Sequence, residues 1–196
     1  RDNKDKMDDC LAKIDVSAKH LLSLVNDVLD MTKLERDTFT LESKPFNLDR
    51  VCIETAEIVR FQAESAGLHV EEEHPDVRNV NLLGSELYLK KILLNLFSNC
   101  IKYNKPGGAI YTRMRELEHT DDTVTYEFFI RDTGVGMTQD FIDNHLFEAF
   151  TQGDNAARSQ YGGTGLGMSI VAQLVKKMNG TIQVESTVGE GSSFTV

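Results

Sequence analysis

Apolar and polar positions in the first part of the chain alternate with the period of a packed helix. From Asp2 to about Asp37 the chain contains no Gly or Pro, so nothing in the sequence interrupts a helix. Apolar or small residues recur there at alternating spacings of four and three: Met7, Leu11, Ile14, Ala18, Leu21, Val25 and Val28. This spacing is typical of a helix in a coiled-coil-like bundle. The alternative is a lone amphipathic helix that docks on the following domain.

The pattern changes at the segment from Lys44 to Leu48, where Pro45 breaks the helical period. We therefore predict two parts, a helix-bearing segment over 1–44 and a domain over 45–196. Beyond the break, helix and strand periods alternate, which indicates an α/β or α+β domain. The predicted elements are helices over about 49–66, 85–103 and 166–178, strands over about 69–73, 80–83, 109–117, 123–131 and 181–185, and a last turn through 189–191 into Phe194. In the strand over 123–131, the pattern places Val124, Tyr126, Phe128 and Ile130 on one face.

Composition and charge exclude several classes of protein. The formal net charge is −10, and no local basic patch overrides it, so neither nucleic acid nor an anionic membrane surface is an expected partner. The longest apolar run is three residues, far short of the roughly 20 that a membrane span needs, and no signal peptide is recognisable. The three cysteines lie far apart, which argues against a disulfide framework or zinc cluster and favours a cytoplasmic setting. Whether a longer parent protein is membrane-bound stays open.

A polar stripe runs along the otherwise apolar helix predicted over 85–103. Asn95 and Asn99 are spaced i, i+4 and Lys102 follows three residues later, so the three side chains share a face. This stripe is either a solvated face or a magnesium site. Neutral amide oxygens suffice as Mg²⁺ ligands when nucleotide phosphates supply the negative charge, and Lys102 would then offset a phosphate.

The chain has two glycine-rich segments, one directly after a predicted strand and one directly before a predicted helix. Asp132-Thr133-Gly134-Val135-Gly136 comes directly after a strand, where the carboxylate can accept a hydrogen bond from an exocyclic amine; the alternative is a simple connecting turn. The run over 162–167 leads into an apolar periodic helix, and backbone N–H groups at a helix start can cradle phosphates. Glycines that only permit close helix packing are the alternative. No P-loop or G-x-G-x-x-G motif is present, so the common nucleotide folds are poor candidates.

Four motifs in this order resemble those of bacterial sensor histidine kinases. They are the N box over 95–103, the first glycine box over 132–136, the F box Phe147-Glu148-Ala149-Phe150, and the second glycine box over 163–167. The resemblance implies an α+β fold, a two-layer sandwich with a mixed sheet packed on helices as in DNA gyrase, preceded by one long bundle helix. Residues 1–44 are similar to the second helix of the dimerisation and histidine-phosphotransfer hairpin of that family.

The same resemblance implies ATP and Mg²⁺ as cofactors and a role for each matching residue. Asn95 and Asn99 would contact Mg²⁺, Lys102 and Tyr103 would border the phosphates, and Asp132 would bind the adenine amine. The remaining implied nucleotide contacts are Gly134 and Gly136 beside the base, Gly163, Thr164, Gly165, Leu166 and Gly167 along the phosphates, and Phe147 and Phe150 at the start of a lid over about 151–162. Arg158 lies in that lid, and the resemblance leaves open whether it reaches the γ-phosphate.

The accepting histidine of the family is the feature that this sequence does not match. In the family a His followed by an acidic residue receives the phosphoryl group, and none of His20, His69, His74, His119 and His145 has such a neighbour. The resemblance therefore implies a kinase whose acceptor lies outside this chain, with a response-regulator receiver domain as partner and a homodimer formed through the helical hairpin. The alternatives are a gyrase-like conformational ATPase, for which Glu86 lies nine residues before Asn95, and a non-catalytic ATP-binding dimerisation module.

Overall fold

The structure is a computed structural model that describes residues 2–34, 36, 39–73, 77–151 and 164–196. It divides into two compact units, Arg1–Phe39 and Thr40–Val196. Each unit is described by itself below.

The first unit is built on one long helix, α1 (Asp2–Leu34). Its predicted apolar stripe is exposed: the side chains of Met7, Leu11, Ile14, Leu21, Val25 and Val28 are all between 40% and 64% accessible. Such a stripe is unfavourable in water without a partner surface. None of the described helices is both long and apolar enough to cross a membrane.

The second unit is organised around a five-stranded mixed sheet. Its strands lie in the order β2 (His69–Glu73), β4 (Ala109–His119), β5 (Val124–Asp132), β7 (Gly191–Thr195) and β6 (Gln183–Thr187). β2 and β4 are parallel, and the other neighbouring pairs are antiparallel. A separate two-stranded sheet pairs β1 (Lys44–Asn47) with β3 (Asn81–Gly84).

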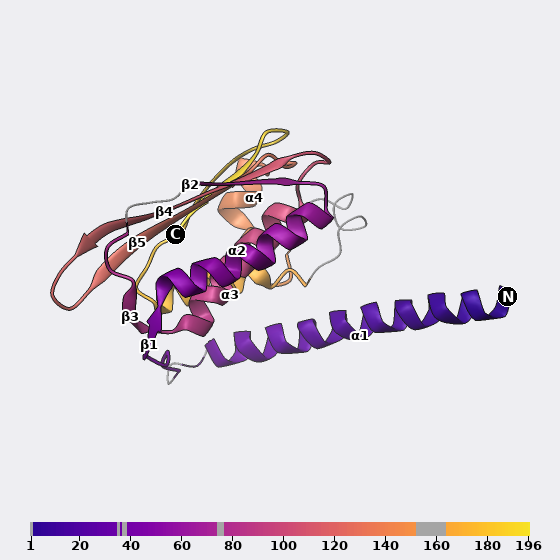
Figure 1. The fold of residues 1–196 in the computed structure, drawn as a ribbon, viewed down its shortest axis with the longest axis horizontal. Helices are drawn as coiled ribbons and strands as arrows, with labels where there is room; N and C mark the ends of the chain where they lie inside the picture. Colours follow the sequence, from indigo (N-terminus) through magenta and orange to yellow (C-terminus); the bar gives the residue numbers. More distant parts are fainter. Residues whose placement is uncertain (1, 35, 37–38, 74–76, 152–163) are drawn as a thin grey trace. The chain divides into compact units, whose positions relative to one another are not determined.

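The helices α2 (Leu48–Ser65), α3 (Glu86–Lys102) and α6 (Gly167–Lys177) form the second layer. α3 contacts both α2 and α6, and the three helices cover one face of the sheet (Figure 1). The short α4 (Gln139–Asn144) contacts β6. The core between the layers is made of fully buried aliphatic residues: Leu48, Val51, Leu96, Ile110, Ile130, Ile170, Val171 and Leu174. This is the predicted two-layer fold with a mixed sheet packed on helices.

The strand β1 is the element that the sequence pattern missed. The sequence predicts only a break at Lys44 to Leu48, because Pro45 cannot donate a backbone hydrogen bond. In the structure Pro45 lies opposite Leu83 in the two-stranded sheet, where β1 has a single neighbour and the missing donor is tolerated. Asn47 then ends the strand and caps α2, since its Oδ1 accepts from Arg50 N at 3.0 Å.

Other predicted boundaries differ from the structure by a few residues. The last helix ends at Lys177 and β4 extends to His119. β6 occupies Gln183–Thr187 rather than 181–185, because its register is set by antiparallel pairing of Val184 with Phe194. The predicted face of β5 is confirmed at Ile130, which is 1% exposed.

Candidate functional site

Asp132 is the last residue of β5, and its side chain is 4% exposed. The carboxylate Oδ1 accepts a hydrogen bond from Gly134 N at 2.8 Å and one from Ser192 N at 3.3 Å. Burial raises the pKa of the Asp132 carboxyl above its ordinary value, while the hydrogen bond from Gly134 opposes that rise. The strand therefore holds an acceptor rigidly at its end, as the sequence predicts.

The glycines after Asp132 allow the loop to pack directly against neighbouring backbone. A Cβ at Gly134 would lie 2.3 Å from Tyr103 O, and Val135 N donates to the same oxygen at 3.0 Å. Gly136 has φ +67°, and a Cβ there would lie 2.0 Å from Thr187 O. This loop thus lies between the end of α3 and the end of β6, and neither glycine position has room for a side chain.

Two polar residues that sequence reasoning missed hold this loop in place. Asn104 is buried, donates from Nδ2 to Ala109 O at 3.1 Å and accepts at Oδ1 from Thr133 Oγ1 at 3.2 Å. The Thr133 hydroxyl in turn accepts from Ala109 N at 2.9 Å. The position of Asn104, just before Pro106-Gly107-Gly108, is the sequence signal that could have been noticed, but it reads as an ordinary turn residue. The hydrogen bonds of Asn104 and Thr133 thus position the loop that follows Asp132.

The predicted polar stripe is present on α3, and its residues make different contacts. Asn95 donates from Nδ2 to Lys91 O at 2.9 Å, while its Oδ1 faces Gly167, where a Cβ would lie 2.9 Å away. Lys102 donates from Nζ to Tyr103 Oη at 2.8 Å and lies 4.5 Å from the centre of its ring. Asn99 is half-buried on the same helix.

The F box and the second glycine box meet through backbone contacts. Phe150 N donates to Gly165 O at 3.0 Å, and both residues have positive φ, 63° at Phe150 and +70° at Gly165. Phe150 is 61% exposed and Phe147 is half-buried. A non-glycine residue with positive φ is strained unless its surroundings hold it. Here the backbone bond to Gly165 does so.

The residue before α6 anchors the start of the helix in the core. Leu166 is 0% exposed, backbone included. Its N–H is bonded to Thr164 Oγ1 at 3.1 Å. The predicted site residues Arg158 and Gly163, and the predicted lid over 152–162, lie outside the described residues.

These contacts join all four motifs into one region. The N box meets the first glycine box through Tyr103 and Gly134, and it meets the second glycine box through Asn95 and Gly167. The F box meets the second glycine box through Phe150 and Gly165. Within the described residues, no group of three His, Cys, Asp or Glu side chains could hold a metal ion. A cation at this site would therefore need amide oxygens together with oxygens of a ligand.

A family model for histidine kinase-, DNA gyrase B- and HSP90-like ATPases matches residues 84–196. The chain belongs to this ATPase family. The matched residues contain α3, β4, β5 and α6, and with them all four motifs. The resemblance predicted from the motifs is thereby confirmed.

Curated relatives of this ATPase-family chain are named histidine kinases. Sensor histidine kinase GacS of Pseudomonas protegens is 39% identical over 188 residues, which cover 96% of this chain and 20% of that protein. Circadian input-output histidine kinase CikA of Synechococcus elongatus is 36% identical, over 92% of this chain and 23% of that protein. The chain thus spans about a fifth of the length of these curated relatives.

Solved structures agree with the family assignment. Full-length ShkA in complex with AMPPNP is 30% identical to this chain with a TM-score of 0.73, covering 91% of this chain and 35% of ShkA. The catalytic domain of histidine kinase ThkA has a TM-score of 0.62 at 18% identity, covering 79% of this chain and 93% of that domain, and supports the fold alone. The fold of this chain is therefore that of histidine kinase catalytic domains, and ATP is the nucleotide that the family binds.

Proposed function

We propose that this chain is the ATP-binding catalytic part of a two-component sensor histidine kinase. It transfers the γ-phosphoryl group of Mg·ATP to a histidine that is not among its own five, for relay to an aspartate of a response regulator. The observation that carries this proposal is the convergence of the four motifs through Tyr103, Gly134, Asn95, Gly167 and Phe150. The kinase names of the relatives support the same reaction class.

Each residue of the site has a role in this proposal. The buried Asp132 carboxylate accepts from the adenine amine, and the backbone at Gly134 and Gly136 lies along the base. Lys102 and Tyr103 border the phosphates. The segment over 163–167, including Thr164 and Leu166, follows the phosphate chain into α6, where helix-start N–H groups favour anions. Phe147 and Phe150 anchor the start of the lid over about 151–162, and Arg158 belongs to that lid.

The residues on α3 fit a magnesium ion that is bound partly by the nucleotide. Asn95 donates a hydrogen bond from Nδ2 to Lys91 O, and its Oδ1, a hard oxygen ligand, faces Gly167 at the start of α6. Mg²⁺ keeps several waters and takes few protein ligands beside substrate phosphates. Asn95 and Asn99 would hold the ion, which supplies neutralisation of phosphate charge when it is bound.

Catalysis by these residues is positioning and charge neutralisation, without a covalent nucleophile from this chain. The acceptor imidazole forms the new P–N bond while the bond from the γ-phosphorus to the bridging oxygen breaks, and ADP leaves. Lys102 and the N–H groups at the start of α6 stabilise the charge on the transferred group and on the leaving diphosphate.

The proposal includes two protein partners, a second copy of this chain and the receiver domain of a response regulator. We infer that the stripe from Met7 to Val28 mediates a homodimer through a helical bundle, because its apolar side chains are exposed along one seam. A receiver domain of a response regulator would take the phosphoryl group. A crystal structure of histidine kinase ThkA in complex with response regulator TrrA shows that such a complex exists for a protein of this fold.

The test is phosphoryl transfer between two chains. The chain is incubated with γ-labelled ATP, alone and with a partner polypeptide that bears the first hairpin helix of a histidine kinase and its acceptor histidine. We expect acid-labile label on the partner and none on this chain. Acid-labile label on this chain that disappears in His20→Gln would contradict the absence of an acceptor, and ATP hydrolysis without any transfer would favour the conformational ATPase.

The magnesium assignment has its own measurement. Calorimetry should show that Mg²⁺ tightens ATP binding to the chain by at least about tenfold, and that this gain is largely lost in Asn99→Ala. Ser98→Ala is the matched control, because Ser98 is an exposed neighbour on the same helix. Equal tightening in Asn99→Ala and the control would remove Asn99 from the metal site.

A further inference from the structure

A second pocket lies between α2 and the sheet, with a volume of about 600 Å³. None of its lining residues is one of the predicted nucleotide-site residues. Its lining includes apolar side chains from both layers: Ala56 and Val59 of α2, Phe97 of α3, and Met114, Phe128 and Ile130 of the sheet. Volumes of this size hold small organic ligands in other proteins, which bind through an apolar wall with a few polar groups.

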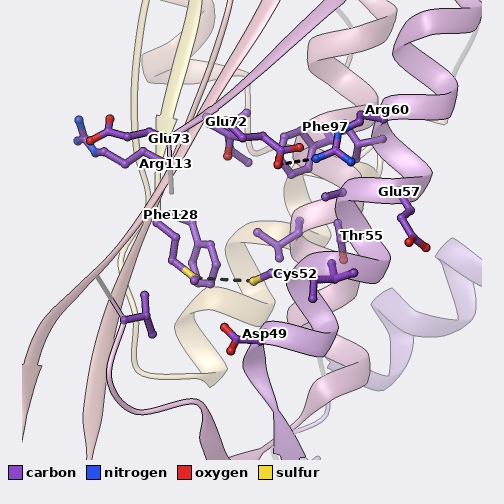
Figure 2. Close-up of a pocket in the computed structure, with 18 residues that line it drawn as sticks. Asp49, Cys52, Thr55, Glu57, Arg60, Glu72, Glu73, Phe97, Arg113 and Phe128 are labelled. Atoms are coloured by element: carbon purple, nitrogen blue, oxygen red, sulfur yellow. Dashed lines mark hydrogen bonds and ion pairs between the residues drawn. The ribbon is translucent and has the colours of Figure 1, made fainter. Parts of the chain in front are cut away.

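The two ends of the pocket carry charge. Asp49 lies at one end, beside Cys52, and Arg60 and Glu72 lie at the other (Figure 2). Arg60 is already neutralised, since its guanidinium is 2.8 Å from the Glu72 carboxylate. Arg113 is likewise paired, with Glu127 outside the pocket. Among the described residues Asp49, Glu57 and Glu73 line the pocket without an ion pair, so the lining carries an excess of negative charge, with Asp49 at the end beside Cys52.

The negative charge of Asp49 acts on Cys52, which also lines the pocket. The pKa of the Cys52 thiol is raised to about 11, first by burial and second by the nearby negative charge of Asp49. The thiol is therefore neutral at ordinary pH and packs as an apolar group, with its Sγ 3.7 Å from Met114 Sδ.

A further polar group in the wall lacks a partner. Thr55 is 2% exposed, and within the described part of the chain its Oγ1 makes no hydrogen bond. A buried hydroxyl without a partner costs about 1 to 3 kcal/mol. Thr55 is one of the residues that line the pocket, and threonine in a helix has two accessible rotamers.

We propose that this pocket binds a small organic cation, with an aromatic or alicyclic ring against its apolar side chains and a protonated amine on the Asp49 carboxylate. The ring contacts Met114 and Phe128, whose side chains are neighbours across β4 and β5. A charge-assisted hydrogen bond to a carboxylate is about twice as strong as a neutral one. The site is separate from the nucleotide site and does not depend on the proposed function.

The experiment uses two probes with one ring and opposite charges, 1-naphthylmethylamine and 1-naphthylacetate. Both are titrated into the isotope-labelled chain in the presence of saturating Mg·AMPPNP, and amide chemical shifts are recorded. We expect the amine to bind at least about tenfold more tightly than the acid, a difference of about 1.4 kcal/mol or more. The largest shift changes should fall on Cys52, Met114 and Phe128.

Three variants complete the test. Asp49→Asn, at an exposed position, should bring the affinities of the amine and the acid within about twofold, whereas Asp140→Asn on α4 should leave the preference intact. Ala56→Phe, which adds a large side chain to the lining, should abolish binding of both probes. The proposal is overturned if neither probe binds by about 1 mM, if the two bind the original chain equally, if the shifts lie elsewhere, or if the preference survives in Asp49→Asn.

Discussion

Gly167, at the start of α6, lies against Asn95 of α3. Its missing side chain leaves room for Asn95 Oδ1, which lies 2.9 Å from where a Cβ would be. That oxygen is at the end of a side chain that can rotate, so a methyl group there displaces the amide rather than the backbone. The geometry of the site depends on this glycine more than the stability of the fold does.

We therefore expect Gly167→Ala to weaken Mg·ATP binding by at least about tenfold, while the free energy of unfolding stays equal or rises slightly, because alanine favours a helix. Calorimetry and urea unfolding measure the two quantities. Gly180→Ala is the control: it follows α6 and its Cβ would meet only Val175, so Mg·ATP affinity should be unchanged. A loss of stability in Gly167→Ala without a loss of affinity would contradict the role of this glycine.

Asp132 combines binding and stability in one buried carboxyl. Burial raises its pKa in the folded protein above 3.8, its ordinary value, so the folded state takes up this proton at a higher pH than the unfolded state does. The stability that this group contributes is therefore complete below pH 3.8 and is lost as pH rises through the folded pKa.

Asp132→Asn removes this titration and keeps an oxygen that can accept from Gly134 and Ser192. The free energy of unfolding of the variant, relative to the original chain, should therefore increase as pH is raised from about 4 to about 7. Urea unfolding at intervals across that range provides the measurement. The same variant should lose the preference for ATP over GTP, because an amide can pair with the carbonyl of guanine. A stability difference that does not change with pH would show that the buried carboxyl does not titrate as described.

At the scale of elements, α1 is distinguished by its apolar stripe, whose described side chains from Met7 to Val28 are exposed. Its stripe keeps the four-three spacing from Met7 to Val28, and Leu21 in the middle is 62% exposed. In the bundle that we propose, Leu21 lies in the seam and Ser23 lies on the outer face.

Leu21→Glu should raise the dissociation constant of the homodimer by at least about tenfold, because it places a charge in an apolar seam. Ser23→Glu adds the same charge to the outer face and should leave it unchanged. Sedimentation equilibrium over a range of concentrations distinguishes the variants. A chain that is monomeric at every concentration would refute the dimer and favour a helix that docks on its own domain.

At the scale of the whole molecule, the division after Phe39 separates two tasks. The unit Thr40–Val196 contains the sheet, the three helices that cover it and the described parts of every motif. The unit Arg1–Phe39 contains α1 with its exposed stripe. Nucleotide binding should therefore belong to one unit and presentation of the acceptor to the other.

Deletion of residues 1–39 should leave the affinity for Mg·ATP within about twofold of the original value and abolish phosphoryl transfer to the hairpin-helix partner. Calorimetry measures the first quantity and the labelled-ATP assay measures the second. Transfer that continues at the original rate without α1 would show that the helix has no part in positioning the acceptor.

The sequence by itself determined the elements and their chemistry wherever the information is local. Helix and strand periods predicted α3, β5 and α6 within a few residues, because periodicity is a property of neighbouring residues. The resemblance of the four motifs to those of histidine kinases implied an ATP-binding kinase domain. β1 escaped prediction because a proline in a strand is acceptable only when the strand has a free edge, and that depends on its partner.

Only the tertiary structure decided which distant residues meet. The approach of Asn95 to Gly167, the packing of Gly134 on Tyr103 and the hydrogen bonds of Asn104 with Thr133 join segments 29 to 72 residues apart. The pocket between α2 and the sheet likewise brings together Ala56 and Phe128, which are distant in the sequence. Such contacts follow from how the layers pack, since close packing selects one arrangement of side chains, and no pattern within a single element contains that arrangement.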